Sequence, residues 1–360
     1  MRDILDDVER WVSEGRPVAT ATVLETWGSA PRPAGGKMAV TADGRIAGSV
    51  SGGCVENAVV EAARQTLATG VPQRLKFGIA DDTAWGVGLA CGGSIEVFVE
   101  RLPGDLFGAI RDALRAERSA AVATVVAGTS DRLGRKAAAF DDGRVLGELD
   151  GAAADAARSG LAGGPSRRVE TGGEEIFVDV LAPSSKLVIV GGVHIAVSLV
   201  TLSKAVGYRT ILVDPREAFG NAGRFPHADQ IVNAWPDRGL AEAGVHAGTA
   251  VAVLTHDPKL DDPAILAALR SPAFYVGALG SRKTQEKRRR RLVEAGATEE
   301  ELSRLHGPIG LPLGGRSPEE IAMAIMAEVV AVCYGTFEGF KGSTVTPARA
   351  RRRAGGGGAA

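Results

Sequence analysis

The sequence has few cysteines, almost no net charge and no long apolar run, and each shortage excludes a class of protein. Three cysteines in 360 residues are too few for a disulfide framework or for a zinc site built from cysteine alone, and they fit a reducing cytoplasm. A formal net charge of −1 argues against a general nucleic-acid binder. Because no apolar segment opens the chain or is long enough to span a bilayer, we expect a cytoplasmic protein without a membrane span.

A chain of this length favours more than one domain. In the first half, alternating segments such as Val18–Thr26 and turn signals such as Asp43-Gly44 are typical of strands joined by hairpins. We therefore predict an N-terminal α+β domain over residues 1–182. We identify no internal repeat.

The pattern changes after Pro183. Lys186–Val190 is an uninterrupted apolar run of the kind found in buried parallel strands, and further runs of this kind alternate with helical patterns. This alternation predicts an α/β domain with a Rossmann-like doubly wound parallel sheet over residues 183–345. The Arg- and Gly-rich residues 346–360 are predicted to form a disordered tail.

Cys54 is the most informative single residue. It follows Gly52 and Gly53 and stands at the expected start of a helix over Asn57–Ala68. A thiol in that position meets the positive end of the helix dipole and unpaired backbone N–H groups, both of which favour the thiolate. Glycines let a ligand approach the backbone closely. We therefore predict that Cys54 is a reactive or ligating thiol.

Cys91 lies in a second glycine-containing loop, and Cys333 lies in an apolar helical segment. If Cys54 and Cys91 are close in space, they could bind one sulfur- or metal-containing ligand, because soft thiolates suit molybdenum–sulfur chemistry, persulfide carriage or copper. We expect Cys333 to be a core residue.

A turn typical of dinucleotide-binding folds opens the second domain. Gly191, Gly192 and His194 follow its first strand, and Asp214 ends the next strand roughly 20 residues later, where an acid would bind a ribose hydroxyl. Val193 stands where a glycine normally lets pyrophosphate approach the backbone. NAD(P) binding is therefore left open at this turn, as is binding of a nucleotide or a pterin.

Other polar residues follow neighbouring strands of the same domain. His256 follows the strand expected at Thr249–Leu254, and Ser281 follows the one at Ala273–Val276 and opens a helix, where an anion can bind. The carboxyl ends of parallel strands line one crevice. We therefore expect one site that contains the residues Gly191, His194, Asp214, His256, Asp257 and Ser281.

Two sequence strings are specific enough to indicate a family. They are Gly-Ser-Val-Ser-Gly-Gly-Cys-Val-Glu at Gly48–Glu56 and Tyr-Val-Gly-Ala-Leu-Gly-Ser-Arg-Lys at Tyr275–Lys283. In this order, and together with segments that match elsewhere, they resemble the xanthine dehydrogenase accessory protein family, called XdhC or CoxI. The additional segments are Gly28–Lys37, Cys91–Glu100, Val188–Ala196 and Gly310–Glu320.

The resemblance implies an accessory protein, or chaperone, for the molybdenum cofactor rather than a catalyst. Such a protein binds molybdopterin, protects it while a cysteine desulfurase-type sulfur donor supports its sulfuration, and passes it to a molybdenum hydroxylase apoenzyme of the xanthine dehydrogenase or CO dehydrogenase type. Cys54 and Cys91 would contact the molybdenum end, and the glycine turns would hold phosphate. We also expect a homo-oligomer.

Two other readings stay open. In the first, the chain is an NAD(P)-dependent oxidoreductase with His256 as acid or base and Asp214 on the ribose. Members of the resembling family often carry Gly-Ala-Gly-His-Val-Ala at the turn where this chain has Gly191–Ala196, so one glycine is missing here and tight dinucleotide binding is disfavoured. In the second, the chain is a structural partner module, which the two cysteine loops disfavour.

Overall fold

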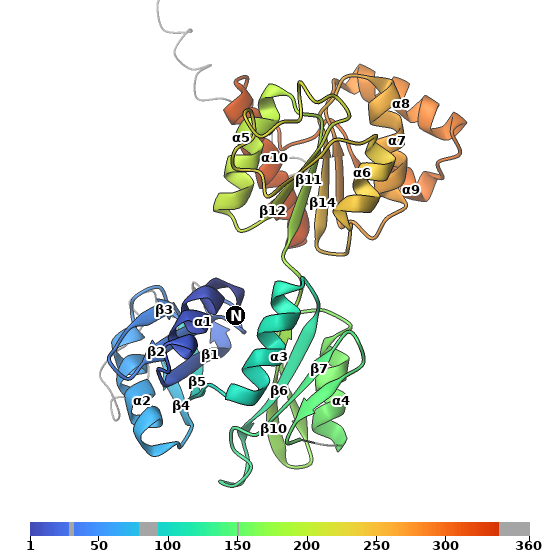
Figure 1. Ribbon diagram of the computed structural model, residues 1–360. Helices are drawn as coiled ribbons and strands as arrows, with labels where there is room; N and C mark the ends of the chain where they lie inside the picture. Colours follow the sequence, from blue (N-terminus) through green and yellow to red (C-terminus); the bar gives the residue numbers. More distant parts are fainter. Residues whose placement is uncertain (29–31, 79–92, 150, 338–360) are drawn as a thin grey trace, which may run out of the picture. The chain divides into compact units, whose positions relative to one another are not determined.

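The computed structural model describes residues 1–28, 32–78, 93–149 and 151–337 (Figure 1). The chain forms two compact units, Met1–Pro183 and Ser184–Ala360. The first is built on antiparallel sheets with helices and the second on one parallel sheet, so the predicted fold class is confirmed. The predicted tail lies outside the described residues. Within the described residues, no helix is long and apolar enough to cross a membrane.

The first half of the N-terminal unit folds as a helix, three strands, a second helix and two strands. Its antiparallel sheet has the strand order β3-β2-β1-β5-β4. On β1, Ala19, Ala21 and Val23 pack with the helix between β3 and β4, and the alternate residues face the other way. The elements are η1 (Arg2–Ile4), α1 (Leu5–Ser13), β1 (Val18–Trp27), β2 (Lys37–Thr41), β3 (Ile46–Gly48), α2 (Glu56–Thr69), β4 (Gln73–Phe77) and β5 (Ser94–Arg101).

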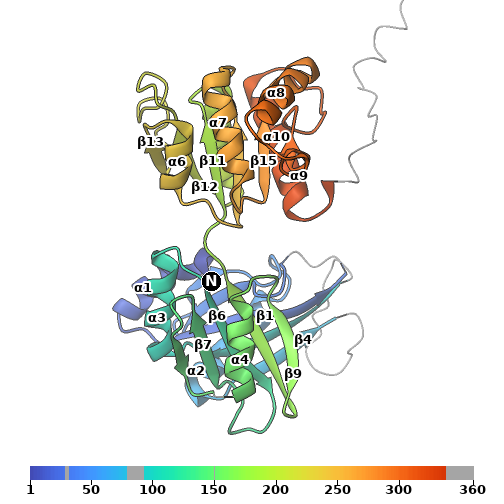
Figure 2. The same ribbon diagram turned by 90° about the vertical axis from the view of Figure 1, so that its right-hand side faces the viewer.

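The second half of this unit has the same succession of elements and the same sheet. Its antiparallel strand order is β8-β7-β6-β10-β9, in which each strand takes the place of its counterpart in the first sheet. Figure 2 shows α3, β6, β7, α4 and β9 of this half. The elements are α3 (Gly104–Arg115), β6 (Ala120–Ala127), β7 (Lys136–Phe140), β8 (Val145–Gly147), α4 (Gly151–Gly160), β9 (Arg167–Thr171) and β10 (Glu174–Leu181).

The N-terminal unit is therefore an internal repeat, and the expectation of no repeat is wrong. Lys37 is paired with Thr22 in the first sheet, and Lys136 is paired with Thr124 at the same place in the second. The sequence signal is the pattern Lys-x5-Asp-Gly-Arg-x-x-Gly, which occurs at 37–48 and again at 136–147. This shared pattern is too short to reveal the repeat from sequence alone, because most other equivalent positions of the two repeats have only their apolar character in common.

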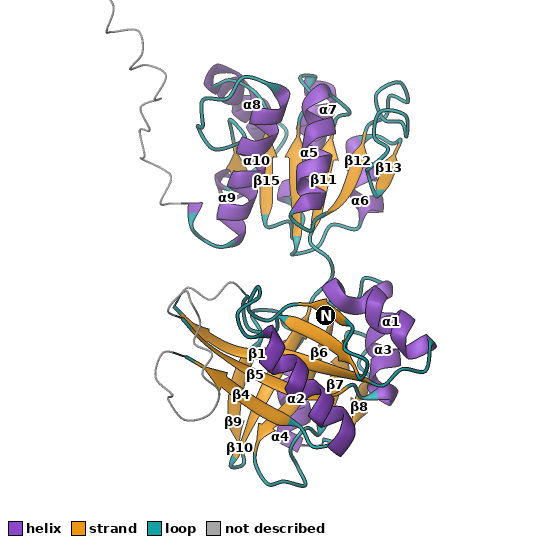
Figure 3. Ribbon diagram, turned by 90° about the vertical axis from the view of Figure 1, so that its left-hand side faces the viewer, coloured by secondary structure: helices purple, strands orange, loops and turns teal. Residues whose placement is uncertain are grey.

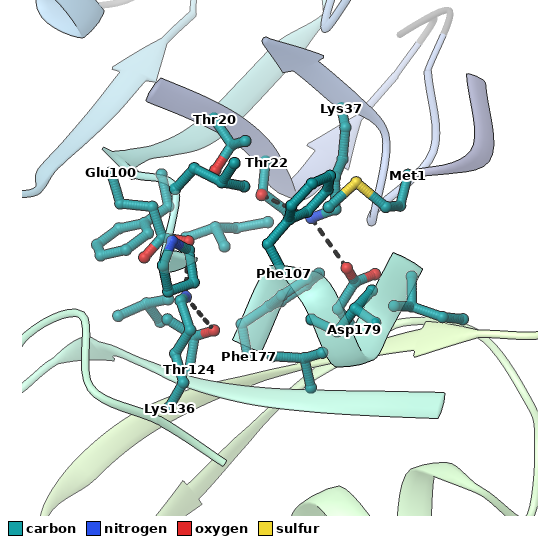
Figure 4. A pocket seen from close by; sticks show the side chains of 18 residues that line it. Met1, Thr20, Thr22, Lys37, Glu100, Phe107, Thr124, Lys136, Phe177 and Asp179 are labelled. Atoms are coloured by element: carbon teal, nitrogen blue, oxygen red, sulfur yellow. Dashed lines mark hydrogen bonds and ion pairs between the residues drawn. The ribbon is translucent and has the colours of Figure 1, made fainter. Parts of the chain in front are cut away.

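Two buried ion pairs cross between the repeats (Figure 4). The Lys37 ammonium of the first repeat lies 2.9 Å from the Asp179 carboxylate of the second, and the Lys136 ammonium of the second lies 2.7 Å from Glu100 of the first. None of these four side chains is more than 10% exposed. Each lysine also donates to the threonine opposite it in its own sheet. Burial lowers the pKa of Lys136, and the Glu100 carboxylate opposes that shift.

The C-terminal unit is a six-stranded parallel sheet covered by helices on both faces (Figure 3). Its strand order is β13-β12-β11-β14-β15-β16, so the direction of the connections reverses between β11 and β14. Ligands of such sheets bind at the carboxyl ends of the strands at that reversal. The strands are β11 (Lys186–Val190), β12 (Arg209–Val213), β13 (Gln230–Val232), β14 (Thr249–Val253), β15 (Tyr275–Ala278) and β16 (Leu305–His306).

The helices of this unit divide between the two faces of the sheet. Two pack together on one face, and their buried residues form one core cluster with that face. They are α5 (His194–Ala205) and α10 (Pro318–Cys333). The second core cluster lies on the other face, against α6 (Pro236–Ala243), α7 (Pro258–Leu269), α8 (Arg282–Glu294) and α9 (Glu299–Ser303).

Lys136→Met is expected to destabilise the N-terminal unit by about 3 kcal/mol, because the Glu100 carboxylate is left buried without its partner. Adding Glu100→Leu removes both charges, and we expect the double variant to recover most of that loss. Urea denaturation of the full chain, with hydrogen exchange to locate the change, measures both effects. Arg111→Met, which breaks a more exposed ion pair with Asp112, is the control. A double variant less stable than Lys136→Met would contradict this account.

Candidate functional site

Cys54 belongs to the loop of residues 49–55 that joins β3 to α2, here called the Cys54 loop. Gly52 and Gly53 precede it with φ values of 81° and 123°, a conformation that side chains rarely adopt. These glycines turn the backbone so that Cys54 is exposed while Ser51 and Val55 on either side of the turn are buried. The loop therefore presents a free thiol on a turn that is anchored at both ends.

Glu56, the first residue of α2, holds this loop in place. Its carboxylate accepts hydrogen bonds from the N–H groups of Val50, Ser51, Gly52, Gly53 and Val55 and from the hydroxyls of two serines, Ser49 and Ser51. Partial burial raises the pKa of Glu56, but these hydrogen bonds outweigh burial and lower the pKa to about 2. The Glu56 carboxylate thus stays ionised, surrounded by the N–H and hydroxyl donors of the Cys54 loop.

This arrangement corrects the predicted environment of the thiol. We expected unpaired N–H groups around Cys54, but the N–H groups from Val50 to Val55 all have acceptors, and that of Cys54 donates to the Ser51 hydroxyl at 3.0 Å. The expectation for Cys333 is also wrong, because it is the last residue of α10 and is exposed. Cys91 lies outside the described residues.

In the C-terminal unit, the turn after β11 is braced by Asp214. The Gly192 N–H donates to one oxygen of this carboxylate at 2.8 Å, and Arg216 donates to both oxygens. The Asp214 side chain is fully buried. Burial raises its pKa, but the hydrogen bonds from Arg216 and Gly192 outweigh that effect and the pKa is lowered. Asp214 therefore holds the turn and cannot accept from a ribose hydroxyl without losing these partners.

The space beside the turn is filled by the chain itself. A Cβ on Gly192 would lie 2.3 Å from the carbonyl oxygen of Phe219, and Arg224 donates to the carbonyl of Gly192 at 2.6 Å. Gly191 is as tightly confined, since its Cβ would lie 2.5 Å from the methyl group of Thr255. The missing side chains of both glycines thus leave room for other parts of the protein, Phe219 and Thr255, to pack against the turn. This geometry gives no support to dinucleotide binding at the turn.

The remaining predicted residues lie near the carboxyl ends of their strands. His194 is exposed as the first residue of α5, beside the Asp214 turn. His256 and Ser281 are exposed and line one cavity between α7 and α8. The Ser281 hydroxyl caps α8 by accepting from the Thr284 N–H at 3.2 Å. Gly191, Gly192 and Asp214 thus share the turn after β11, and His256 and Ser281 share the cavity between α7 and α8. Gly191 packs against Thr255, next to His256, and Asp257 caps α7, so the prediction that these residues form one site stays a prediction.

Sequence reasoning did not find the role of Glu56 or the basic side chains of α8. Glu56 stands two residues after Cys54, and its position at the first turn of a helix is the signal that the sequence offers. Among the residues that the structure describes, no group of three or more His, Cys, Asp or Glu side chains could hold a metal ion.

Two family models match the chain. The one described as the XdhC Rossmann domain matches residues 187–329, and the one described as the XdhC and CoxI family matches residues 11–78, which include the Cys54 loop. A crystal structure described as a xanthine dehydrogenase from Bacillus halodurans superposes with a TM-score of 0.74 at 25% identity, covering 95% of this chain and 98% of the other.

Two curated relatives align along most of their length. One, from Bacillus subtilis, is named as a probable subunit of xanthine dehydrogenase and is 29% identical over 317 residues, which is 86% of this chain and 91% of the relative. The molybdenum cofactor insertion chaperone PaoD from Escherichia coli is 27% identical over 332 residues, which is 92% of this chain and 88% of the relative.

Glu56→Gln is expected to loosen the Cys54 loop and to lower stability by about 2 kcal/mol, because the amide presents N–H groups to a ring of donors. Hydrogen exchange at residues 50–55 and the rate of Cys54 labelling should both rise. Since Glu56 titrates near 2, its contribution should be complete above the ordinary pKa of glutamate and should fade as the pH falls toward 2. Glu61→Gln, an exposed change on the same helix, is the control; equal labelling rates in both variants would count against the role of Glu56.

NADH is expected not to bind at about 1 mM, and Val193→Gly is expected not to create binding, because Phe219 and Arg224 occupy the space beside Gly192. Quenching or enhancement of NADH fluorescence on titration measures this directly. Micromolar binding by Val193→Gly would show that Val193 alone had blocked the turn.

Proposed function

Because this chain belongs to the XdhC and CoxI family, we propose that it is an accessory protein that binds the molybdenum cofactor and supports its sulfuration and its insertion into a molybdenum hydroxylase apoenzyme. The relative named as a molybdenum cofactor insertion chaperone supports this reading, since the match covers 92% of the chain. The client enzyme would be of the xanthine dehydrogenase or CO dehydrogenase type.

The observation that carries this proposal is the exposed thiol on a fixed turn. Cys54 has the soft sulfur that suits a molybdenum–sulfur group, and the hydrogen bonds of Glu56 hold its backbone in one conformation. A thiol on a mobile loop would lose conformational entropy on binding, whereas this one is already positioned. Cys91 is retained in the proposal as a second contact to the molybdenum end.

The cofactor is cargo in this proposal, so the chain must hold it and then release it whole. Weak, distributed contacts suit that task better than a closed set of metal ligands. The described residues contain no such closed set, which is compatible with transient holding. A sulfur donor of the cysteine desulfurase type, a homo-oligomer and a cytoplasmic location remain part of the proposal.

The alternative of an NAD(P)-dependent oxidoreductase is not favoured by any observation. Asp214 is engaged by Arg216 and Gly192, and the backbone of Gly192 is covered. His256 lines the cavity between α7 and α8.

The full chain isolated from a molybdate-fed host is expected to carry molybdenum and pterin, measured by metal analysis and pterin fluorescence. Cys54→Ser should keep the fold and lower the retained molybdenum about tenfold, because a hydroxyl is a poor ligand for a soft metal. Cys333→Ser, which changes a second thiol that is exposed in the described part of the chain, should retain as much as the unaltered chain. Equal retention by Cys54→Ser would refute the thiol role.

A further inference from the structure

A cavity of about 170 Å³ lies between α7 and α8, at the carboxyl edge of the parallel sheet. His256 enters it from the end of β14, and Ser281 enters it from the start of α8. The first turns of both helices border the cavity. Helix N-termini carry N–H groups outside the intrahelical hydrogen bonds and attract anions.

The lining of this cavity is strongly basic. Lys283, Lys287, Arg288 and Arg291 line it from α8, and Asp261 is the carboxylate that lines it from α7. That carboxylate is engaged by Arg288 at 2.7 Å, and Arg291 is paired with Asp262 at 2.6 Å. Among the described residues, Lys283 and Lys287 make no ion pair, and both are exposed. The ammonium groups of Lys283 and Lys287 therefore give this cavity an excess of positive charge that no carboxylate in the described part of the chain pairs with.

Arg288 supplies an independent observation. It is 1% exposed, and its two terminal nitrogens donate to Leu279, Gln285 and Asp261. Its remaining donor, Nε, is buried and has no acceptor within the part of the chain that the structure describes. A buried donor without an acceptor costs free energy, and Arg288 is also one of the side chains that line the cavity.

We propose that this cavity binds the phosphate end of a small ligand, a phosphate monoester or a diphosphate. Lys283 and Lys287 meet the anion at the mouth, the first N–H groups of α8 face it, and Arg288 stands at the inner wall. The site itself stands on this geometry. Its assignment to the phosphate of a pterin cofactor rests on the proposed function, and a nucleotide would offer the same chemistry.

Calorimetric titration of the full chain with inorganic pyrophosphate at low salt tests the site. The variant Lys283→Gln/Lys287→Gln is expected to bind about tenfold more weakly, because two charge-assisted contacts are lost. Arg282→Gln/Arg289→Gln removes the same charge from residues of α8 that do not line the cavity, and it should bind within about twofold of the unaltered chain. Failure of the unaltered chain to bind, or equal losses in both variants, would overturn the site.

Competition separates the two sources of phosphate. Displacement of pyrophosphate by molybdopterin released from a molybdoenzyme, but not by ADP, assigns the site to the cofactor. Displacement by ADP assigns it to a nucleotide. If pyrophosphate binding depends on Lys283 and Lys287 while the chain from a molybdate-fed host carries no molybdenum, the phosphate site stands and the proposed function fails.

Discussion

Two crossed ion pairs specify how the two repeats of the N-terminal unit meet, and neither repeat can complete a pair alone. Lys37 is neutralised by Asp179 and Lys136 by Glu100, each from the other repeat. Leaving either lysine buried without its carboxylate is far more costly than losing an exposed ion pair. Slippage or separation of the sheets would break both pairs at once, so one mutual arrangement of the repeats is favoured over its neighbours. The Cys54 loop is built on a sheet fixed in this way.

The repeats differ where the function is proposed to lie. In the first, residues 49–55 join β3 to α2 and carry the thiol, whereas in the second only residues 148–150 separate β8 from α4. The first also has residues 78–93 between β4 and β5, where the second has only Gly172 and Gly173 between β9 and β10. The same fold therefore occurs once with long connections and once with short ones.

Local patterns in the sequence predicted much of the fold. Alternation along Val18–Thr26 and the apolar run Lys186–Val190 each corresponds to a strand, because burial on one or both faces of a sheet determines these patterns. The crossed ion pairs could not be predicted, since Lys136 and Glu100 meet only after both sheets have formed. The role of Glu56 depends on a side chain folding back over its own helix start, which many sequences could do. Cys333 was misplaced because the apolar pattern of its helix continues to the last turn, where burial ends.

The internal symmetry carries a consequence for ancestry. In a two-fold symmetric homodimer, each contact occurs twice. If position i of the first copy contacts position j of the second, then position j of the first copy also contacts position i of the second. The two repeats meet in this manner through Lys37 with Asp179 and Lys136 with Glu100. These reciprocal contacts are what we expect if a gene encoded a single self-associating repeat and was then duplicated and fused. Fusion would also release the two copies from identity, so that one could lengthen its loops around a thiol while the other preserved the shared interface.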